Sequence, residues 1–169
     1  MSVGDAMCAC DAAFAQTRGV AVDGDAHTAA CVVLDTNIVL DLWIYDDPAT
    51  PALRAALEAG ALRWLATQVM RDELERVLAY AHIVRRLQQN GQSAADVLSH
   101  FDRLSQLVSV AEKAPFTCKD PDDQKFLDLA ATHRAVLVSK DKAVLTMRNR
   151  MARLGVAVGK VWPVLAVSV

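Results

Sequence analysis

Short apolar runs alternate with amphipathic segments along most of the chain after residue 30. Runs that are nearly continuous in aliphatic residues predict strands at 31–34, 62–65, 136–139 and 156–162, with a further short strand at 108–110. Apolar residues recur at helical spacing over 38–43, 51–59, 68–81, 93–107, 121–133 and 143–154. Strands that are apolar throughout are buried on both faces, and their alternation with helices is typical of a parallel sheet. The pattern therefore predicts an α/β fold, a three-layer α/β/α sandwich around a mostly parallel sheet.

The region 81–107 reads as a helical pair inserted beside this sheet, with its turn at 88–92. It holds more apolar residues than a thin layer over a sheet requires: Ile83, Val84, Leu87, Val97, Leu98, Phe101 and Leu104. We therefore expect part of its surface to support self-association or to receive a partner protein.

Two acidic residues end buried strands of the predicted sheet. Asp35 follows the run at 31–34, and Asp141 closely follows the run at 136–139. Sites in open α/β sheets form outside the carboxyl ends of the strands, so both carboxylates fall where a site is expected. An acid at either place can also simply cap the next helix, although that explanation is weaker for the two together.

Neighbouring polar residues are placed to orient these two carboxylates. Thr36 and Asn37 would hydrogen-bond Asp35, and Ser139 would do the same for Asp141 or for a metal-bound water.

A third acid, Glu73, lies in the predicted helix 68–81. It shares a stripe with Val69, Met70 and Val77, whereas neighbouring positions of the helix carry opposite charges at i,i+4 spacing, as solvated faces do. The pattern predicts that Glu73 points inward. The alternative is a surface glutamate at the edge of the apolar stripe.

Three further acids open the predicted helix 121–133. Asp120 suits an N-cap with Pro121 at the first helical position. Apolar residues follow Asp123 at i+3, i+4 and i+7, so Asp123 extends the core-facing stripe to the mouth of the helix. Asp122 is the second choice for this inward acid, since helix registers read from sequence can slip by one residue.

The four inward acids, Asp35, Glu73, Asp123 and Asp141, have too few neighbouring cations in the sequence to neutralise them in pairs. Clustered carboxylates raise one another's pKa and repel unless a positive charge lies between them. A hard divalent ion with oxygen ligands is the usual solution, so the sequence predicts a Mg²⁺ or Mn²⁺ site.

Composition agrees with one globular domain: the chain has 169 residues, of which 53% are hydrophobic and 22% charged. A net charge of −2 gives no general attraction to nucleic acid. RNA would have to be bound through metal ions or through a local basic strip, for which Arg148 and Arg150 are the candidates; a merely solvated helix face explains these arginines equally well.

Cysteine usage and the first 30 residues suggest the compartment. The four cysteines lack the C-x-x-C spacing of a zinc site and do not form a disulfide framework, so reduced thiols are expected. Residues 1–30 lack a basic n-region, and they read as a flexible extension or as the product of a misplaced start codon. No apolar stretch reaches the length of a membrane span, so we expect a cytoplasmic protein without membrane contact, with its ordered domain at 31–169.

The order of these motifs resembles the PIN domain family. The resemblance rests on Val-Leu-Asp-Thr-Asn at 33–37, on Glu73 in a helix, on Asp-Pro-Asp-Asp at 120–123 leading into a helix, and on Val-Ser-Lys-Asp-Lys at 138–142. It covers about residues 31–163 and is strongest for the branch described as toxins of toxin–antitoxin pairs.

The resemblance implies a metal-dependent ribonuclease with an acidic pocket. In such an enzyme Asp35, Asp123 and Asp141 would hold one or two Mg²⁺ or Mn²⁺ ions, and Glu73 would be a ligand or would position water. RNA would be the substrate, and a cognate antitoxin or a second copy of the chain would be a partner. The family commonly has a further acid two residues after the fourth, where this chain has Ala143, which puts a second metal ion in doubt more than the first.

Two other functions fit parts of the pattern. A PIN-like binding module with little activity is compatible with Ala143 and the low basicity. A haloacid-dehalogenase-like phosphatase also begins with an aspartate after a buried strand, but it needs a second acid two residues later, where this chain has Asn37.

Overall fold

The computed structural model describes residues 29–164, so the expectation for the N-terminal extension falls almost wholly outside the described part of the chain. Five strands form one sheet in the order β3-β2-β1-β4-β5, and every pairing is parallel. The strands are β1 (Ala30–Leu34), β2 (Leu62–Ala66), β3 (Ser105–Leu107), β4 (Val136–Val138) and β5 (Val158–Gly159). The predicted α/β class with a parallel central sheet is confirmed.

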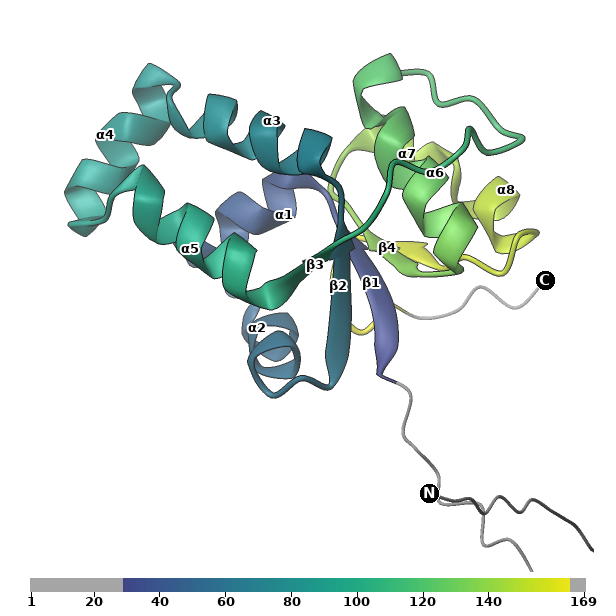
Figure 1. Cartoon of the computed structure of the whole chain (residues 1–169), viewed down its shortest axis with the longest axis horizontal. Helices are drawn as coiled ribbons and strands as arrows, with labels where there is room; N and C mark the ends of the chain where they lie inside the picture. Colours follow the sequence, from purple (N-terminus) through teal and green to yellow (C-terminus); the bar gives the residue numbers. More distant parts are fainter. Residues whose placement is uncertain (1–28, 165–169) are drawn as a thin grey trace, which may run out of the picture.

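Helices cover this sheet on both sides (Figure 1). They are α1 (Thr36–Leu40), which continues into the π-helical turn η1 (Asp41–Tyr45), α2 (Pro51–Glu58), α3 (Gln68–Leu78), α4 (Ala81–Asn90), α5 (Ala94–Leu104), the 3-10 turn η2 (Pro121–Asp123), α6 (Gln124–His133), α7 (Lys142–Thr146) and α8 (Arg148–Ala152). In Figure 1, α1 and α3 to α5 lie on one side of strands β1 and β2, and α6 to α8 lie on the other. Within residues 29–164, no helix has the length and apolar character needed to cross a bilayer.

The core forms where the apolar strands meet α6. Val32 and Val33 of β1 and Leu137 of β4 are fully buried, as are Leu127 and Leu129 of α6. Burial on both sheet faces explains why these strands are apolar without alternation. The strand ends are thereby fixed, and so are the polar residues that directly follow them.

Several element boundaries differ from the sequence prediction. The helix predicted over 93–107 ends at Leu104, and the next three residues form β3 instead of a strand at 108–110. Ser105 and Leu107 pair with β2, so the open edge of the sheet overrides local helix preference. The helix predicted over 143–154 is divided at Met147 into α7 and α8, and the last strand is only two residues long.

The inserted helical pair exists as α4 and α5, and its apolar residues divide into a buried group and a partly buried group. Ile83, Leu87, Val97 and Phe101 are buried in the core of the domain itself, and Phe101 packs edge-on against Trp64 at a centroid distance of 4.8 Å. These four side chains pack within the domain itself. Val84, Leu98 and Leu104 are only partly buried, and the use of this surface for self-association or for an antitoxin stays a prediction.

Candidate active site

The sheet register brings Asp35 and Ser139 side by side. Leu34 of β1 pairs with Val138 of β4, so the next residue of each strand lies at the same level beyond the sheet. The Asp35 amide donates to the Val138 carbonyl at 3.0 Å, and the Ser139 hydroxyl donates to Asp35 Oδ2 at 2.6 Å. Asp35 is only 3% exposed, and it caps α1 by accepting a hydrogen bond from the backbone N–H of Asn37 at 3.4 Å.

The Asp35 carboxyl is buried among negative charges. Burial raises its pKa above the ordinary value, the hydrogen bonds from Ser139 and the Asn37 amide oppose that rise, and the charges of Asp141 and Glu73 add to it. The two hydrogen bonds do not fully offset the cost of ionising this group. A cation close to Asp35 would remove that cost.

Asp141 is tied to the same serine. Its backbone N–H donates to Ser139 Oγ at 3.0 Å, and its carboxylate caps α7 by accepting from the Ala143 N–H at 2.6 Å. Ser139 therefore links the carboxylate of Asp35 to the main chain of Asp141. The expectation that Ser139 orients the Asp141 side chain is corrected accordingly.

Glu73 approaches the cluster from α3. Its Oε1 accepts a hydrogen bond from Thr36 Oγ1 at 3.0 Å, and its Oε2 lies 2.5 Å from Lys125 Nζ. Thr36 thus orients Glu73, and not Asp35 as expected. Lys125 also donates to the carbonyl of Asp122, and its ammonium lies 4.6 Å from the centre of the Phe126 ring.

The buried stripe of α3 is displaced from the predicted one. Met70, Leu74 and Leu78 form it, whereas Val69 is 51% exposed. Glu73 sits beside this stripe with 20% of its side chain exposed. It reaches the site because α1 lies against α3.

Lys125 is the cation that the sequence argument missed. It lies two residues after Asp123 and neutralises an acid far away in the chain. Local charge spacing identifies i,i+3 and i,i+4 partners only, so no sequence signal pointed to this pair. One of the four acids is therefore already compensated.

Asp123 is the least compensated acid of the cluster. It ends η2, and its Oδ2 atom is buried without a hydrogen-bond partner among the described residues. Burial first, and then the charges of Asp35 and Asp141, raise the pKa of Asp123 to about 7. Asp122 is exposed on the same turn, which favours Asp123 as the inward acid.

The donor set fits a hard divalent cation. Every candidate ligand is a carboxylate oxygen, the donor type that Mg²⁺ and Mn²⁺ prefer. The unpartnered Asp123 oxygen is the group that such an ion would satisfy. Within residues 29–164, no three acidic, cysteine or histidine side chains form a ready-made ligand set, so binding would require the carboxylates to turn toward one another.

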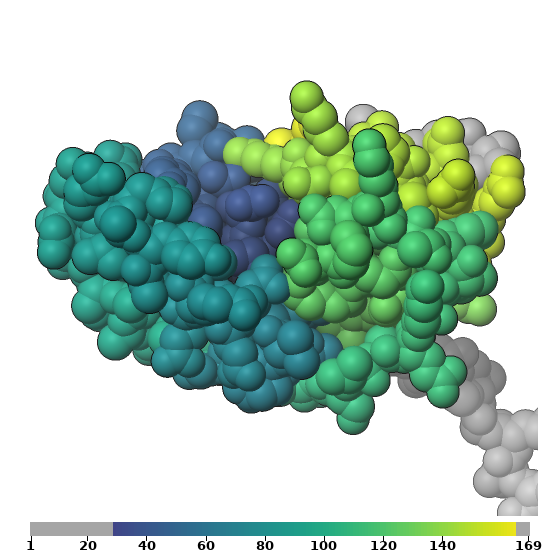
Figure 2. All heavy atoms as spheres, turned by 90° about the horizontal axis from the view of Figure 1, so that it is seen from above, coloured from purple at the N-terminus to yellow at the C-terminus, as the bar shows by residue number. Residues whose placement is uncertain are grey.

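The surface is hollowed above the carboxyl ends of the strands (Figure 2). Seen from above in Figure 2, the hollow separates the teal α3–α4 side from the green α6 side, with the purple start of the domain at its base.

A second ion-pair network, also missed from sequence, fixes the base of the site. Lys140 Nζ lies 2.6 Å from Asp41 Oδ2 and 2.5 Å from Asp47 Oδ2, and hydrogen bonds to both carboxylates raise the pKa of Lys140. Although it is adjacent to Asp141 in sequence, its charge is used to hold η1 against the end of β4.

The two arginines predicted to contact RNA have different environments. Arg148 is half-buried, and its Nε donates to the carbonyl of Val158 at 3.1 Å, so it connects α8 to β5. Arg150 is exposed, and its Nη1 lies 3.7 Å from Met147 Sδ. Arg150 is therefore the more available of the two to a ligand, since its one contact is the weak one to sulfur.

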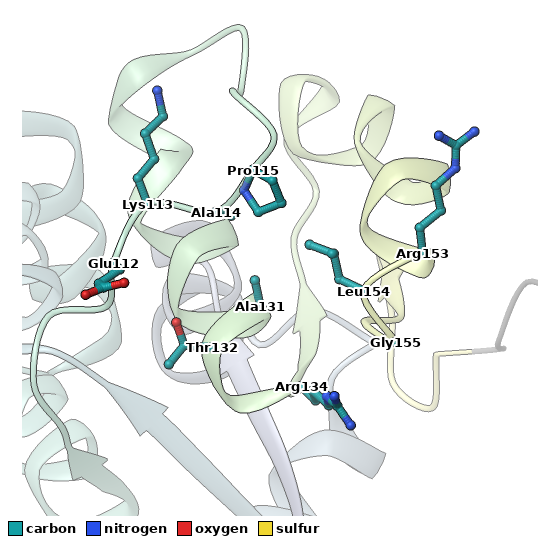
Figure 3. Close-up of a pocket in the computed structure, with 10 residues that line it drawn as sticks. All are labelled: Glu112, Lys113, Ala114, Pro115, Ala131, Thr132, Arg134, Arg153, Leu154 and Gly155. Atoms are coloured by element: carbon teal, nitrogen blue, oxygen red, sulfur yellow. The ribbon is translucent and has the colours of Figure 1, made fainter.

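Another hollow lies at the C-terminal end of α6 (Figure 3). Lys113, Arg134 and Arg153 line it, but their charged ends point in different directions. They therefore do not form a convergent anion site.

Comparison with known proteins identifies the family of the chain. The sequence model described as a PIN domain matches residues 31–143, well over half of the chain. No curated protein matches it. The matched segment spans β1 to the start of α7 and includes all four acids of the cluster. The chain therefore belongs to the PIN domain family, whose members are typically nucleases that use divalent metal ions.

Proposed function

We propose that the protein is a metal-dependent ribonuclease that hydrolyses phosphodiester bonds of RNA with Mg²⁺ or Mn²⁺. The observation that carries the proposal is the buried, unpartnered oxygen of Asp123, which lies close enough to Asp35 and Asp141 for their charges to help burial raise its pKa to about 7. Such clustering is unfavourable for folding alone, and it is typical of a functional site.

The acidic residues would have two different roles, metal binding and the positioning of water. Asp35, Asp123 and Asp141 would hold the ion. When bound, a divalent ion supplies an activated water near neutral pH and positive charge for the scissile phosphate. Glu73, fixed by Thr36 and Lys125, would accept a hydrogen bond from the attacking water and hold it in line with the phosphate.

Lys125 would add positive charge at the cleft. Its ammonium contacts Glu73, and the residue lies two positions after Asp123 in the sequence. With Ala143 in place of a fifth acid, the carboxylates suffice for one ion more readily than for two. Lys125 would then supply part of the positive charge that a second ion would have provided.

Conservative amide variants test this function. Asp123→Asn should abolish Mn²⁺-dependent cleavage of single-stranded RNA, because it removes a ligand without changing side-chain shape. Asp120→Asn is the matched control: Asp120 caps η2 through the Asp122 N–H at 2.9 Å, and asparagine caps almost as well. Full metal-dependent cleavage by Asp123→Asn would contradict the proposed site.

We infer the toxin role from the motif resemblance alone. In that role the protein would be cytoplasmic and paired with an antitoxin, and residues 31–169 would form the nuclease domain. Expression of the wild-type chain should arrest growth, expression of Asp35→Asn should not, and a product of the adjacent reading frame should restore growth. Growth unaffected by an actively cleaving wild-type protein would remove the toxin role and leave the nuclease.

One observation favours the alternative of a binding module with little activity. Glu73 is already neutralised by Lys125, and the position of the family's additional acid is Ala143. Calorimetric titration separates the two functions, since a protein that binds neither Mg²⁺ nor Mn²⁺ would not catalyse metal-assisted hydrolysis.

A further inference from the structure

A further hollow adjoins Glu73. Glu73, Arg76, Val77, Tyr80 and Asp122 line it, and its volume is about 470 Å³. This volume is within the usual range of small-ligand sites, roughly 300–1,000 Å³. Because Glu73 belongs to both places, a chain bound over the acids would extend into this hollow.

Spacing along α3 creates one wall of the hollow. Glu73 and Val77 are one helical turn apart and lie on one face, and Tyr80 follows where α3 joins α4. The opposite wall is Asp122 of η2. The hollow therefore lies between two elements that each supply an acid to the cluster.

Tyr80 exposes an aromatic surface that the core does not use. The residue is 48% exposed, and its ring lies 6.1 Å from that of His82 with a tilt of 35°. Exposed aromatic rings are the usual stacking platforms for unpaired bases, whatever the base, because every base has a π face.

Arg76 has no ion-pair partner within residues 29–164, and it is exposed. Arg71 of the same helix differs, because its Nε and Nη2 donate to the two carboxylate oxygens of Asp102 at 2.6 and 2.8 Å. A guanidinium without a partner beside an aromatic platform is suited to a phosphate. The Asp122 carboxylate on the opposite wall would repel that phosphate toward Arg76.

From this juxtaposition we propose that Tyr80 and Arg76 form a nucleotide-binding subsite, in which Tyr80 stacks an unpaired base and Arg76 contacts its phosphate. The inference rests on the proposed nuclease function and deepens it. The subsite selects single strands, because paired bases cannot present a face to Tyr80. It also sets the position of the strand relative to the acids.

Tyr45 provides a matched control for Tyr80. Tyr45 is 40% exposed, comparable to Tyr80, but Arg86 lies over its ring at 5.9 Å. Its stacking face is therefore occupied. Substitution of Tyr45 reports the general effect of losing an exposed tyrosine.

Binding is measured in the Asp35→Asn background with Mg²⁺ present, so that the RNA stays intact. The probe is a short single-stranded RNA that contains 2-aminopurine, whose fluorescence is quenched by stacking. Adding Tyr80→Ala should weaken binding roughly tenfold and reduce the quenching, while Tyr80→Phe and Tyr45→Ala should leave both unchanged. Arg76→Gln should lower the salt slope of binding by about 0.7, the value for one phosphate contact on a single strand.

Equal affinity and quenching in Tyr80→Ala would overturn the subsite, and so would an absence of binding in every variant. Loss of binding in Tyr80→Phe would exclude stacking as its basis.

A cleavage assay in the otherwise wild-type protein distinguishes failure of the subsite from failure of the nuclease function. If Tyr80→Ala lowers kcat/KM for single strands with little change in kcat, both inferences are supported. If cleavage depends on Asp123 but not on Tyr80, only the subsite fails. If the wild-type protein never cleaves yet binding depends on Tyr80, only the nuclease function fails.

Discussion

Asp123→Asn should stabilise the metal-free protein at pH values above about 4, where the carboxyl of Asp123 ionises in the unfolded chain. The folded protein holds the pKa of this carboxyl at about 7, against an ordinary value of 3.8. Because the folded state binds the proton more tightly than the unfolded state, the free energy of unfolding falls as pH rises from about 4 to about 7. Asparagine keeps the shape of the side chain and removes the charge, so this fall disappears in the variant.

The magnitude follows from the shift of roughly three pKa units, each worth about 1.4 kcal/mol. That gives an upper value of about 4 kcal/mol. Because the Asp123 side chain is partly exposed, water reduces the cost, and about 2 kcal/mol is the reasonable expectation. For a domain of this size, the same free energy corresponds to roughly 5 °C or more in Tm.

Urea denaturation in the presence of a chelator, followed by tryptophan fluorescence, measures this difference directly. Asp123→Asn and the wild-type protein should have similar stability at about pH 4 and below, and the variant should be the more stable by about 2 kcal/mol at pH 8. Excess Mg²⁺ should then raise the Tm of the wild-type protein and have little effect on that of the variant. A stability difference that is the same at both pH values, or a variant that is less stable at pH 8, would refute the reasoning.

The remaining predictions concern three other side chains. Asp96 accepts hydrogen bonds from the backbone N–H and hydroxyl of Ser93, and these bonds lower its pKa. Asp96→Asn should therefore lower the free energy of unfolding at neutral pH and lose this effect as pH falls below about 4. The same urea assay should show this trend, which is opposite to that of Asp123. Arg148→Gln should lower Tm and leave RNA affinity nearly unchanged, because its guanidinium holds β5; a large loss of affinity at unchanged Tm would restore its predicted role in RNA binding. Lys125→Gln removes the cation that neutralises Glu73, so calorimetry should show tighter Mg²⁺ binding, and unchanged affinity would count against the ion pair.

The two strand-end acids were predictable because their positions depend on short-range sequence. A continuous apolar run followed by an aspartate places the carboxylate at a strand end in any parallel sheet, which suffices for Asp35 and Asp141. Their relation to each other was not predictable. It depends on β1 and β4 being neighbours in register, a pairing between segments about a hundred residues apart, and the Ser139 contact follows from that register.

Helix periodicity was less reliable for the other two acids. Glu73 contacts Thr36 and Lys125, but the stripe from which it was predicted to point inward included Val69, which the structure leaves half exposed. The three residues after Leu104 form a strand because they pair with the free edge of β2, and helix periodicity cannot predict such a pairing. Where a hydrogen-bonding partner lies far away in sequence, local preference decides little.

The structure separates two acids that the sequence treated alike. Glu73 is compensated by Thr36 and Lys125, whereas Asp123 keeps a buried oxygen without a partner beside two other carboxylates. A cation that enters the cleft therefore gains most by approaching Asp123 and Asp35, and it gains least at Glu73, whose charge is already balanced. Glu73 is thus better suited to positioning water than to binding metal. The pair Glu73–Lys125 joins the acidic cluster to the neighbouring hollow at Tyr80, so both sites depend on the same wall of α3.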